Sequence, residues 1–309
     1  MEIERVHPQL RQMVQRAPKV DIGSRFMRHV ARFGSRYLLP RAKTAGVSVH
    51  NVRAGTVRLR LYIPQQRTGA GLVWIHGGGM VIGAPQQDDL LCAATAAQLG
   101  IVIASADYRM APEHPYPTPQ HDCLEVWNWT QHNAEKLGLD HERIAVGGAS
   151  AGGGLAASLV NTLHDSGDVQ PLAQWLLYPM LDDRTAADRT LDSIDHYIWN
   201  NTANRIGWTA LLRGTTTPGA HNVPADASPA RRSHTGSLPR TWIGVGDIDL
   251  FHHEDTTYAR NLMSAGTPVD LTVLAGAPHG FENLARDTPI VRDFIDDAQQ
   301  WLARAVQTR

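Results

Sequence analysis

Apolar residues recur along the chain in two alternating patterns from about residue 57 onwards. Short, often β-branched apolar runs are separated by longer segments in which apolar residues return every three or four positions. The first run, residues 57–63, alternates apolar and polar residues and predicts a strand with one face in water. Later runs are more uniformly apolar and predict strands buried on both faces of a mainly parallel sheet. These runs are residues 72–75, 101–104, 144–146, 175–178, 241–245 and 269–274.

The segments between these runs have a helical period. We expect helices over about residues 87–99, 119–137, 151–165, 254–265 and 289–307. The last is the clearest, because its apolar residues form one stripe. Strands that alternate with helices predict a doubly wound α/β fold with right-handed crossovers, here a single domain over residues 1–309 with a sheet of about eight strands.

Two segments do not follow this alternation. Residues 1–45 are helix-like and precede the first predicted strand, and residues 183–230 contain Trp199 and Trp208 before a Thr-, Pro-, Gly- and Ala-rich passage. A helical insertion at this point would lie above the carboxyl edge of the sheet, where open α/β sheets bind ligands. We expect the two segments to form a cap, with Trp199 and Trp208 as candidate walls of a substrate pocket. Surface helices and a loop are the alternative.

Composition narrows the class of partner. Lys and Arg total 29 against 30 Asp and Glu, a formal net charge of -1, so there is no electrostatic case for nucleic acid or an anionic membrane. No apolar run approaches the roughly 18 residues of a membrane span, and the N-terminus does not resemble a signal peptide, so we expect a cytoplasmic protein. Cys92 and Cys123 lie in helix-like contexts and are expected to be reduced, packed thiols.

Ser150 lies in Gly148-Ala149-Ser150-Ala151-Gly152, directly after a predicted strand and directly before a predicted helix. In that context a G-x-S-x-G sequence predicts a nucleophile elbow, a strained turn that projects the serine hydroxyl from the top of the sheet. The small residues Gly148 and Gly152 permit the turn, and the N-terminus of the following helix favours developing negative charge. Ser150 is therefore the predicted nucleophile.

A run of three glycines, Gly77, Gly78 and Gly79, follows His76 and the predicted strand that ends at residue 75. Successive glycines have no side chains to pack, so we expect a loop whose backbone approaches a ligand closely. This is the HGGG-type oxyanion loop that accompanies a nucleophile elbow. The expected donors are the amides of Gly78, Gly79 and Ala151, and losing one such donor typically costs about 2.7–4 kcal/mol of transition-state stabilisation.

A serine nucleophile needs a base, and the base needs an acid that orients it. His279 stands out among 15 histidines because it follows the last predicted strand in a loop, at the edge where Ser150 should lie. Asp247 and Asp249 both follow the preceding strand, and spacing alone does not separate them. The order Ser150, Asp249, His279 is that of α/β hydrolases.

Four motifs keep their order along the chain and carry a family resemblance. They are His76-Gly77-Gly78-Gly79, residues 107–117 (DYRMAPEHPYP), residues 147–153 (GGASAGG) and Pro278-His279-Gly280-Phe281. Over about residues 55–305 the chain resembles the hormone-sensitive-lipase-like family of α/β-hydrolase esterases. The resemblance implies a cap, short- to medium-chain acyl esters as substrates, and Asp249 as the acid, since residues 249–255 resemble the family's acid segment.

Two positions depart from the family's pattern. The residue before the nucleophile is commonly Asp or Thr in the family and is Ala149 here, so the turn must be supported differently. The residue four after the acid, where a carboxylate is common, is His253. Neither residue belongs to the triad or to the oxyanion glycines. Both departures therefore bear on the substrate rather than on the chemistry.

Residues 107–117 are interpreted as scaffold rather than as catalyst. Their prolines fix a turn, and Arg109 with Asp107 or Glu113 would form a structural ion pair. No spacing of His, Asp, Glu and Cys suggests a metal site, and no cofactor is implied.

The predicted chemistry is a two-step acyl transfer through an acyl-enzyme on Ser150. The resemblance implies a serine carboxylesterase or lipase with a small-molecule ester as its partner, and a homodimer is left open. An amidase or another acyl hydrolase with the same triad is the main alternative. A non-catalytic small-molecule-binding member of the fold is another, and matched ester and amide assays would separate the three.

Overall fold

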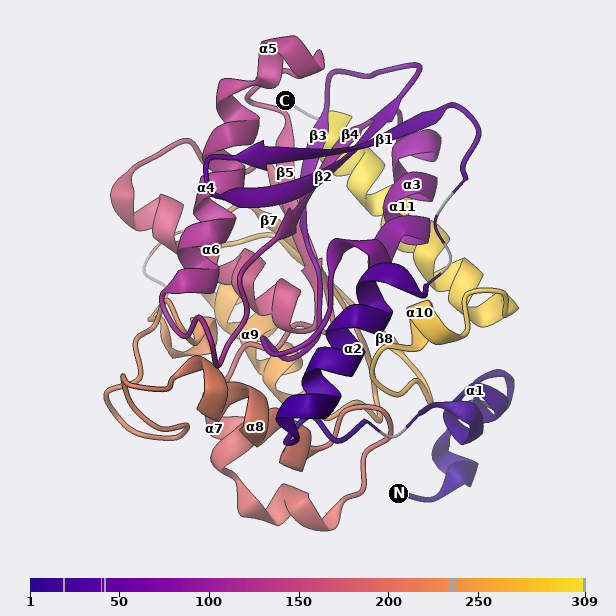
Figure 1. Cartoon of the computed structure of the whole chain (residues 1–309), viewed down its shortest axis with the longest axis vertical. Coiled ribbons are helices and arrows are strands. Elements are labelled where there is room, and N and C mark those ends of the chain that lie inside the picture. The colour runs from indigo at the N-terminus through magenta and orange to yellow at the C-terminus, as the bar shows by residue number, and fades with distance from the viewer. Residues whose placement is uncertain (19, 40, 42, 234–235, 237, 308–309) are drawn as a thin grey trace.

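The computed structural model describes all residues except 19, 40, 42, 234–235, 237 and 308–309, and is built around an eight-stranded sheet in the order β1-β2-β4-β3-β5-β6-β7-β8 (Figure 1). The strands are β1 (Val47–Ala54), β2 (Val57–Pro64), β3 (Gly71–Ile75), β4 (Val102–Asp107), β5 (Ile144–Ala149), β6 (Ala173–Leu177), β7 (Arg240–Gly246) and β8 (Val269–Leu274). β2 runs antiparallel to β1 and β4, and all other neighbours are parallel. The predicted mainly parallel α/β sheet is confirmed.

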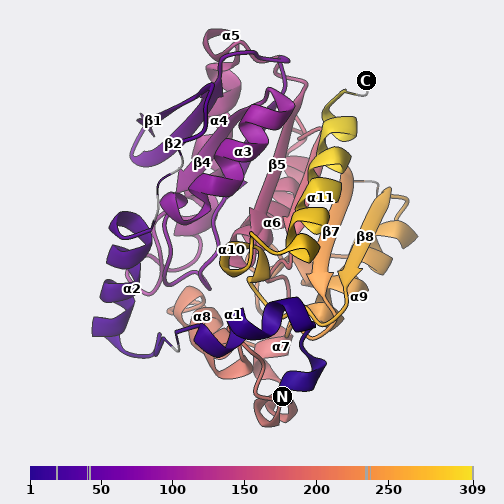
Figure 2. The same cartoon turned by 90° about the vertical axis from the view of Figure 1, so that its right-hand side faces the viewer.

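Helices cover both faces of this sheet. α3 (Asp89–Leu99) and α11 (Pro289–Gln307) pack on one face, in front of the sheet in Figure 2. α4 (Thr118–His132), α6 (Ala151–Ser166) and α9 (His252–Ser264) pack on the other. The other helices are α1 (Arg11–Arg16), α2 (Arg25–Tyr37), α5 (Ala134–Leu137), α7 (Asp183–Ala187), α8 (Asn201–Leu211) and α10 (Phe281–Leu284). The 3₁₀ turns are η1 (Ile3–Arg5), η2 (Pro8–Leu10), η3 (Pro85–Asp88), η4 (Arg189–Ser193) and η5 (Pro229–Arg231).

Local signals set the ends of several helices. α3 and α6 stop at Gly100 and Gly167, whose φ angles of 64° and 71° are left-handed and favour glycine. Asn200 caps the N-terminus of α8, and its side chain accepts a hydrogen bond from the amide of Ala203 at 3.0 Å. Cys92 on α3 and Cys123 on α4 are buried free thiols, as predicted. In the part of the chain that the structure describes, no helix is long and apolar enough to span a membrane.

β2 differs from its predicted environment. Its alternating pattern predicts one face in water, but Arg58 is the one exposed residue of the strand. Arg60 is buried because Asp89 of α3 pairs with it through two contacts of 2.7 Å. Tyr62 donates to the same carboxylate at 2.6 Å. A polar position in a strand is therefore buried when a distant element supplies its partner.

The two edge strands differ from the sequence expectation as well. β8 is predicted as buried on both faces, yet each of its residues is at least partly exposed. β7 is its one neighbour in the sheet, so β8 has an open side. At the opposite edge, β1 was not located from the sequence, because its mostly exposed residues lack an apolar run.

The two segments expected as a cap lie at the end of the sheet toward which the parallel strands point (Figure 2). They also contact each other. Tyr197 donates a hydrogen bond to the carbonyl of Met1 at 2.9 Å. A Cβ atom on Gly23 would lie 3.5 Å from the Cδ1 atom of Ile206 on α8. Both segments therefore adjoin the carboxyl edge, which carries the residues described next.

Candidate active site

Ser150 occupies the turn between β5 and α6 with φ 56° and ψ −122°. Side-chain-bearing residues rarely adopt this conformation, and holding it costs about 1–3 kcal/mol. The Ser150 amide donates to the carbonyl of Leu177 at 2.9 Å, and its carbonyl accepts from Met180 at 2.8 Å and from Gly154 at 3.1 Å. The chain leaving β6 thus supports the turn through backbone bonds. No polar side chain is needed at Ala149, which is buried.

Glycines let the elbow pack directly on its neighbours. A Cβ atom on Gly152 would lie 2.0 Å from the carbonyl oxygen of Ile75, at the end of β3. A Cβ atom on Gly77 would lie 2.9 Å from the carbonyl oxygen of Ala149 and 3.2 Å from Cβ of Ser150. The HGGG loop therefore runs beside the predicted nucleophile.

Ser150, His279 and Asp249 form a continuous hydrogen-bonded chain. Ser150 Oγ lies 2.9 Å from His279 Nε2, and His279 Nδ1 lies 2.9 Å from Asp249 Oδ2. The other carboxylate oxygen of Asp249 accepts the amide of Phe251 at 2.9 Å. Asp247 is exposed and instead accepts a hydrogen bond from the amide of Gly276 at 2.6 Å. Of the two candidate acids, Asp249 is the one in contact with His279.

Aromatic rings surround the imidazole of His279. The ring of Tyr178 meets it edge-on at a centroid distance of 4.6 Å, and that of Phe251 at 5.1 Å. Trp199 lies further away, at 6.3 Å. Tyr178 and Phe251 were not among the predicted site residues. Their one signal in the sequence is position, because Tyr178 ends a predicted strand and Phe251 closely follows another.

His76 holds the glycine loop in place and is not a free base. Its side chain is fully buried, and Nδ1 donates to the carbonyl of Gly77 at 2.8 Å. Its ring stacks on Tyr108 at 4.3 Å, and the Tyr108 hydroxyl donates to the His76 carbonyl at 3.1 Å. Burial lowers the pKa of His76 to about 4, so the imidazole is neutral near pH 7.

The backbone of the loop is turned by Gly78 and Gly79, whose φ angles are 118° and 58°. A Cβ atom on Gly78 would lie 2.1 Å from the carbonyl oxygen of Ile82, so no other residue fits there without a shift of the backbone. Ala151 is the first residue of α6, where amides have no acceptor within the helix. Gly77, the first glycine of the loop, and Ala151 thus both adjoin Ser150.

The structure places the two predicted tryptophans differently. A Cβ atom on Gly79 would lie 2.1 Å from Cη2 of Trp199, so the indole is in contact with the glycine loop. Trp208 is completely buried in the main core. Its neighbour Gly207 faces the loop, since a Cβ atom there would lie 2.6 Å from the Gly79 carbonyl oxygen. Helix α8 and the turn before it thus pack on the glycine loop.

The ion pairs predicted within residues 107–117 are wrong. Arg109 pairs with Asp122 of α4 at 2.6 Å. Asp107 pairs with Arg36 of α2 at 2.7 Å. Glu113 also finds its partner on α2, not within its own segment. The partners come from helices folded against the segment, which proximity in the sequence does not predict.

Glu254 is a buried carboxyl group that the sequence did not single out. It accepts the amides of Leu181 at 2.7 Å and Asp182 at 3.2 Å, together with the hydroxyl of Thr185. Burial raises the pKa of Glu254 well above its usual range. Glu254 joins α9, just after Asp249, to the chain that leaves β6. Within the described ranges, no three His, Cys, Asp or Glu side chains are grouped as metal ligands.

Comparisons with known proteins identify the family of the chain. Residues 72–283 match the profile of a family described as alpha/beta hydrolase fold. An ethyl acetate hydrolase from Pseudomonas putida is 32% identical over 82% of this chain and 77% of its own length. A carboxylic ester hydrolase from Mycobacterium tuberculosis is 36% identical over 75% of this chain and 62% of its own length. The solved structure of a bacterial heroin esterase superposes with a TM-score of 0.92 at 31% identity, covering 99% of both chains.

Proposed function

The chain belongs to the hormone-sensitive-lipase-like family of α/β hydrolases, and on that premise we propose that it hydrolyses carboxylic esters with Ser150 as its nucleophile. The observation that carries this proposal is the pair of 2.9 Å contacts that joins Ser150 through His279 to Asp249. A serine, a histidine base and a buried acid in this order are what nucleophilic acyl transfer requires.

The reaction proceeds in two steps. His279 takes the Ser150 proton as Oγ attacks the ester carbonyl carbon, and Asp249 holds the imidazole in the productive tautomer. The amides of Gly78, Gly79 and Ala151 donate to the tetrahedral oxyanion. His279 then protonates the departing alcohol. In the second step, water gives a proton to His279 and attacks the acyl carbon. The bond from this carbon to Ser150 Oγ then breaks, the carboxylic acid leaves, and His279 returns the proton to Ser150.

Short- to medium-chain acyl esters are the proposed substrates. Trp199 touches Gly79, so an acyl group bound at the glycine loop would lie beside the indole. The Pseudomonas putida relative is named for ethyl acetate, a short acyl ester. We assign the role of cap to residues 1–45 and 183–230, which adjoin this edge of the sheet. Trp208 as a pocket wall, the homodimer and the cytoplasmic location stay predictions.

Replacement of the nucleophile tests the proposal. Ser150→Ala is expected to lower the rate of p-nitrophenyl butyrate hydrolysis by several orders of magnitude, with an unchanged circular dichroism spectrum. Ser166→Ala, at the exposed far end of the same helix α6, is the matched control and should keep the wild-type rate. Activity retained in Ser150→Ala would overturn the assignment. A matched p-nitroanilide, cleaved as fast as the ester, would favour an amidase.

A further inference from the structure

Arginine side chains of helix α2 bond to the rest of the protein. Arg28 donates to two carbonyl groups of the turn before the helix at 2.8 and 2.9 Å. Arg32 donates to the carbonyl of Val81 at 2.8 Å, and Arg36 makes two hydrogen bonds, of 2.8 and 2.7 Å, with Asp107. Because these arginines are four residues apart, they share one side of the helix. No residue of α2 is buried.

The apolar side of α2 faces away from the protein. Phe26 is 72% exposed and Phe33 is 56% exposed. By helical geometry the apolar residues lie about 130° around the axis from the arginines. The helix is at the margin of the molecule in Figure 2, so this side points outward. We call this surface the α2 stripe, and its exposed residues are Phe26, Val30, Phe33, Tyr37, Leu38 and Leu39. Large apolar residues exposed together along one helix and its C-terminal end are typical of an interaction site.

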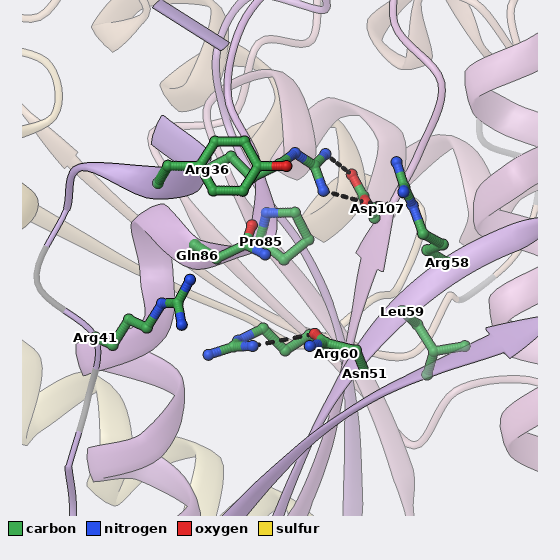
Figure 3. Close-up of a pocket in the computed structure, with 10 residues that line it drawn as sticks. Arg36, Arg41, Asn51, Arg58, Leu59, Arg60, Pro85, Gln86 and Asp107 are labelled. Carbon is green, nitrogen blue, oxygen red and sulfur yellow. Dashed lines mark hydrogen bonds and ion pairs between the residues drawn. The ribbon is translucent and has the colours of Figure 1, made fainter. Parts of the chain in front are cut away.

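A cationic cavity of about 270 Å³ adjoins the C-terminal end of the α2 stripe (Figure 3). Tyr37 belongs to both surfaces. We call it the arginine cavity, and its charged lining residues are Arg36, Arg41, Arg58, Arg60 and Asp107. Figure 3 shows Arg41 and Arg60 pointing into the cavity from opposite sides.

The arginine cavity keeps positive charge after its internal pairs are counted. Four arginines face the carboxylates of Asp107 and of Asp89, which pairs with Arg60, so the local net charge is +2. Arg58 is 60% exposed and reaches Asp107 through one contact of 3.3 Å. Arg41 has no hydrogen bond or ion pair with any residue that the structure describes. Arg41 and Arg58 can therefore bind an external anion.

We propose that the α2 stripe and the arginine cavity together form a docking surface for lipid bilayers that carry anionic headgroups. The stripe enters the boundary between headgroups and acyl chains, and the cavity receives a lipid phosphate. A helix with Phe, Val, Leu and Tyr on one side and basic residues beside them is typical of helices that lie in this boundary. The formal net charge of -1 over the whole chain hides this local positive charge.

The charge around the α2 stripe favours an anionic bilayer over a second copy of the chain as the binding partner. In a symmetric dimer built on the α2 stripe, each arginine cavity would face the basic helix of its partner, and like charges across an interface are unfavourable. Helix α2 contains no Asp or Glu that could compensate. A free phosphate would use the arginine cavity but would leave the α2 stripe uncovered. An anionic bilayer satisfies both surfaces together.

Docking would bring the glycine loop toward the lipid. Arg32 of the same helix holds the carbonyl of Val81, and the amide of Val81 bonds to the carbonyl of Gly78 at 3.1 Å. Binding to the bilayer does not depend on ester hydrolysis. Failure of the docking proposal and failure of the proposed esterase activity can therefore be told apart.

Vesicle co-sedimentation with the full chain tests the docking surface. We expect the protein to sediment with vesicles of equimolar phosphatidylcholine and phosphatidylglycerol and to stay in solution with phosphatidylcholine alone. The bound fraction should fall as salt is added, because salt screens exposed charges. A protein that ignores the anionic vesicles, or binds both kinds equally, would overturn the proposal.

Two double variants separate the two surfaces. Phe26→Ser with Phe33→Ser alters the α2 stripe, and Arg41→Gln with Arg58→Gln alters the arginine cavity. Each pair is expected to weaken vesicle binding by at least about tenfold, because affinity for such a bilayer needs both apolar contact and charge. Each pair should keep the circular dichroism spectrum and the urea midpoint of the wild type, which shows that the variants fold.

The matched control replaces exposed apolar residues away from α2. Val169 is 51% exposed and Met263 is 46% exposed, so Val169→Ser with Met263→Ser should bind vesicles like the wild type. Equal loss in this control would mean that binding is not specific to the α2 stripe. Loss in the arginine pair alone would indicate a site for free phosphate, and self-association abolished by the phenylalanine pair would indicate a second copy. Each of these three outcomes overturns the proposal.

Discussion

Trp199 and Gly79 are in direct contact, since a Cβ atom on residue 79 would lie 2.1 Å from Cη2 of the indole. The tryptophan therefore occupies space beside an amide that we assign to the oxyanion. Trp199→Ala is expected to enlarge the acyl site and to raise kcat/KM for octanoate relative to acetate by about tenfold or more. A series of p-nitrophenyl esters of increasing acyl length measures this ratio.

Trp208→Phe is the comparison for that series, because Trp208 is fully buried in the core of the protein. We expect it to change the rates for all chain lengths by a similar factor. A uniform effect of Trp199→Ala would contradict a role in chain-length preference. A shift of preference in Trp208→Phe would add Trp208 to the pocket wall.

Replacing the two neighbouring acids in turn tests the triad. Asp249→Asn should lower kcat by roughly 10⁴-fold, because an amide at this position favours the wrong imidazole tautomer. Asp247→Asn keeps a side-chain oxygen that can still accept the Gly276 amide, so it should have a far smaller effect. Rates for p-nitrophenyl butyrate under saturating conditions decide between them. A larger loss of kcat in the Asp247 variant would mean that Asp247, not Asp249, is the triad acid.

The buried pair of Arg60 and Asp89 predicts a large loss of stability. Arg60→Ala leaves Asp89, which is completely buried, without its cation, and the expected loss in free energy of unfolding is about 3–5 kcal/mol. Urea denaturation followed by tryptophan fluorescence measures it. Arg53→Ala removes an exposed arginine from neighbouring β1 and should stay within about 0.5 kcal/mol of the wild type. Equal losses would argue against the pair.

Asp88 predicts a pH dependence of stability. Burial raises its pKa to about 7, although Trp74 donates to its carboxylate at 2.7 Å. The folded protein therefore holds a proton that the unfolded chain releases above its ordinary pKa of about 3.9. This contribution to stability is present at low pH and is lost as pH rises from about 4 to about 7.

Asp88→Asn does not titrate, and its amide oxygen can still accept from Trp74. As pH rises from about 4 to about 7, the free energy of unfolding of the variant should increase relative to that of the wild type, by up to roughly 1.4 kcal/mol per pH unit. Above that window the difference should stay constant. Urea titrations at a series of pH values measure the difference. Asp293→Asn, exposed on α11, should follow the wild type at every pH. Parallel curves for Asp88→Asn would refute a raised pKa.

Position in the chain carried most of the information about the site. Ser150, Asp249 and His279 each follow a predicted strand, and parallel strands end at one edge, so their proximity could be predicted. The aromatic rings around His279 could not, because a tyrosine or phenylalanine after a strand is as compatible with the core. The backbone hydrogen bonds that support the turn next to Ala149 could not be predicted either, because they do not depend on the side chains.

The largest departures from sequence expectation involve arginine. Arg60 falls on the predicted wet face of β2 and is buried, and Arg32 and Arg36 form the inner side of α2. Periodicity assigns charged residues to water because an unpaired buried charge is costly. That rule fails where a carboxylate or carbonyl from a distant part of the sequence pairs with the arginine. The tertiary fold alone determines whether such a partner is present.

The nucleophile and the base follow strands that differ in how fully the rest of the sheet covers them. Ser150 follows β5 in the middle of the sheet, whereas His279 follows β8, an edge strand with every residue at least partly exposed. Edge segments open at lower free energy than the centre of a fold. Fraying of β8 would withdraw the imidazole while the elbow stayed intact. On warming, activity would then be lost at a lower temperature than the core unfolds. On cooling, activity would return once β8 paired with β7 again.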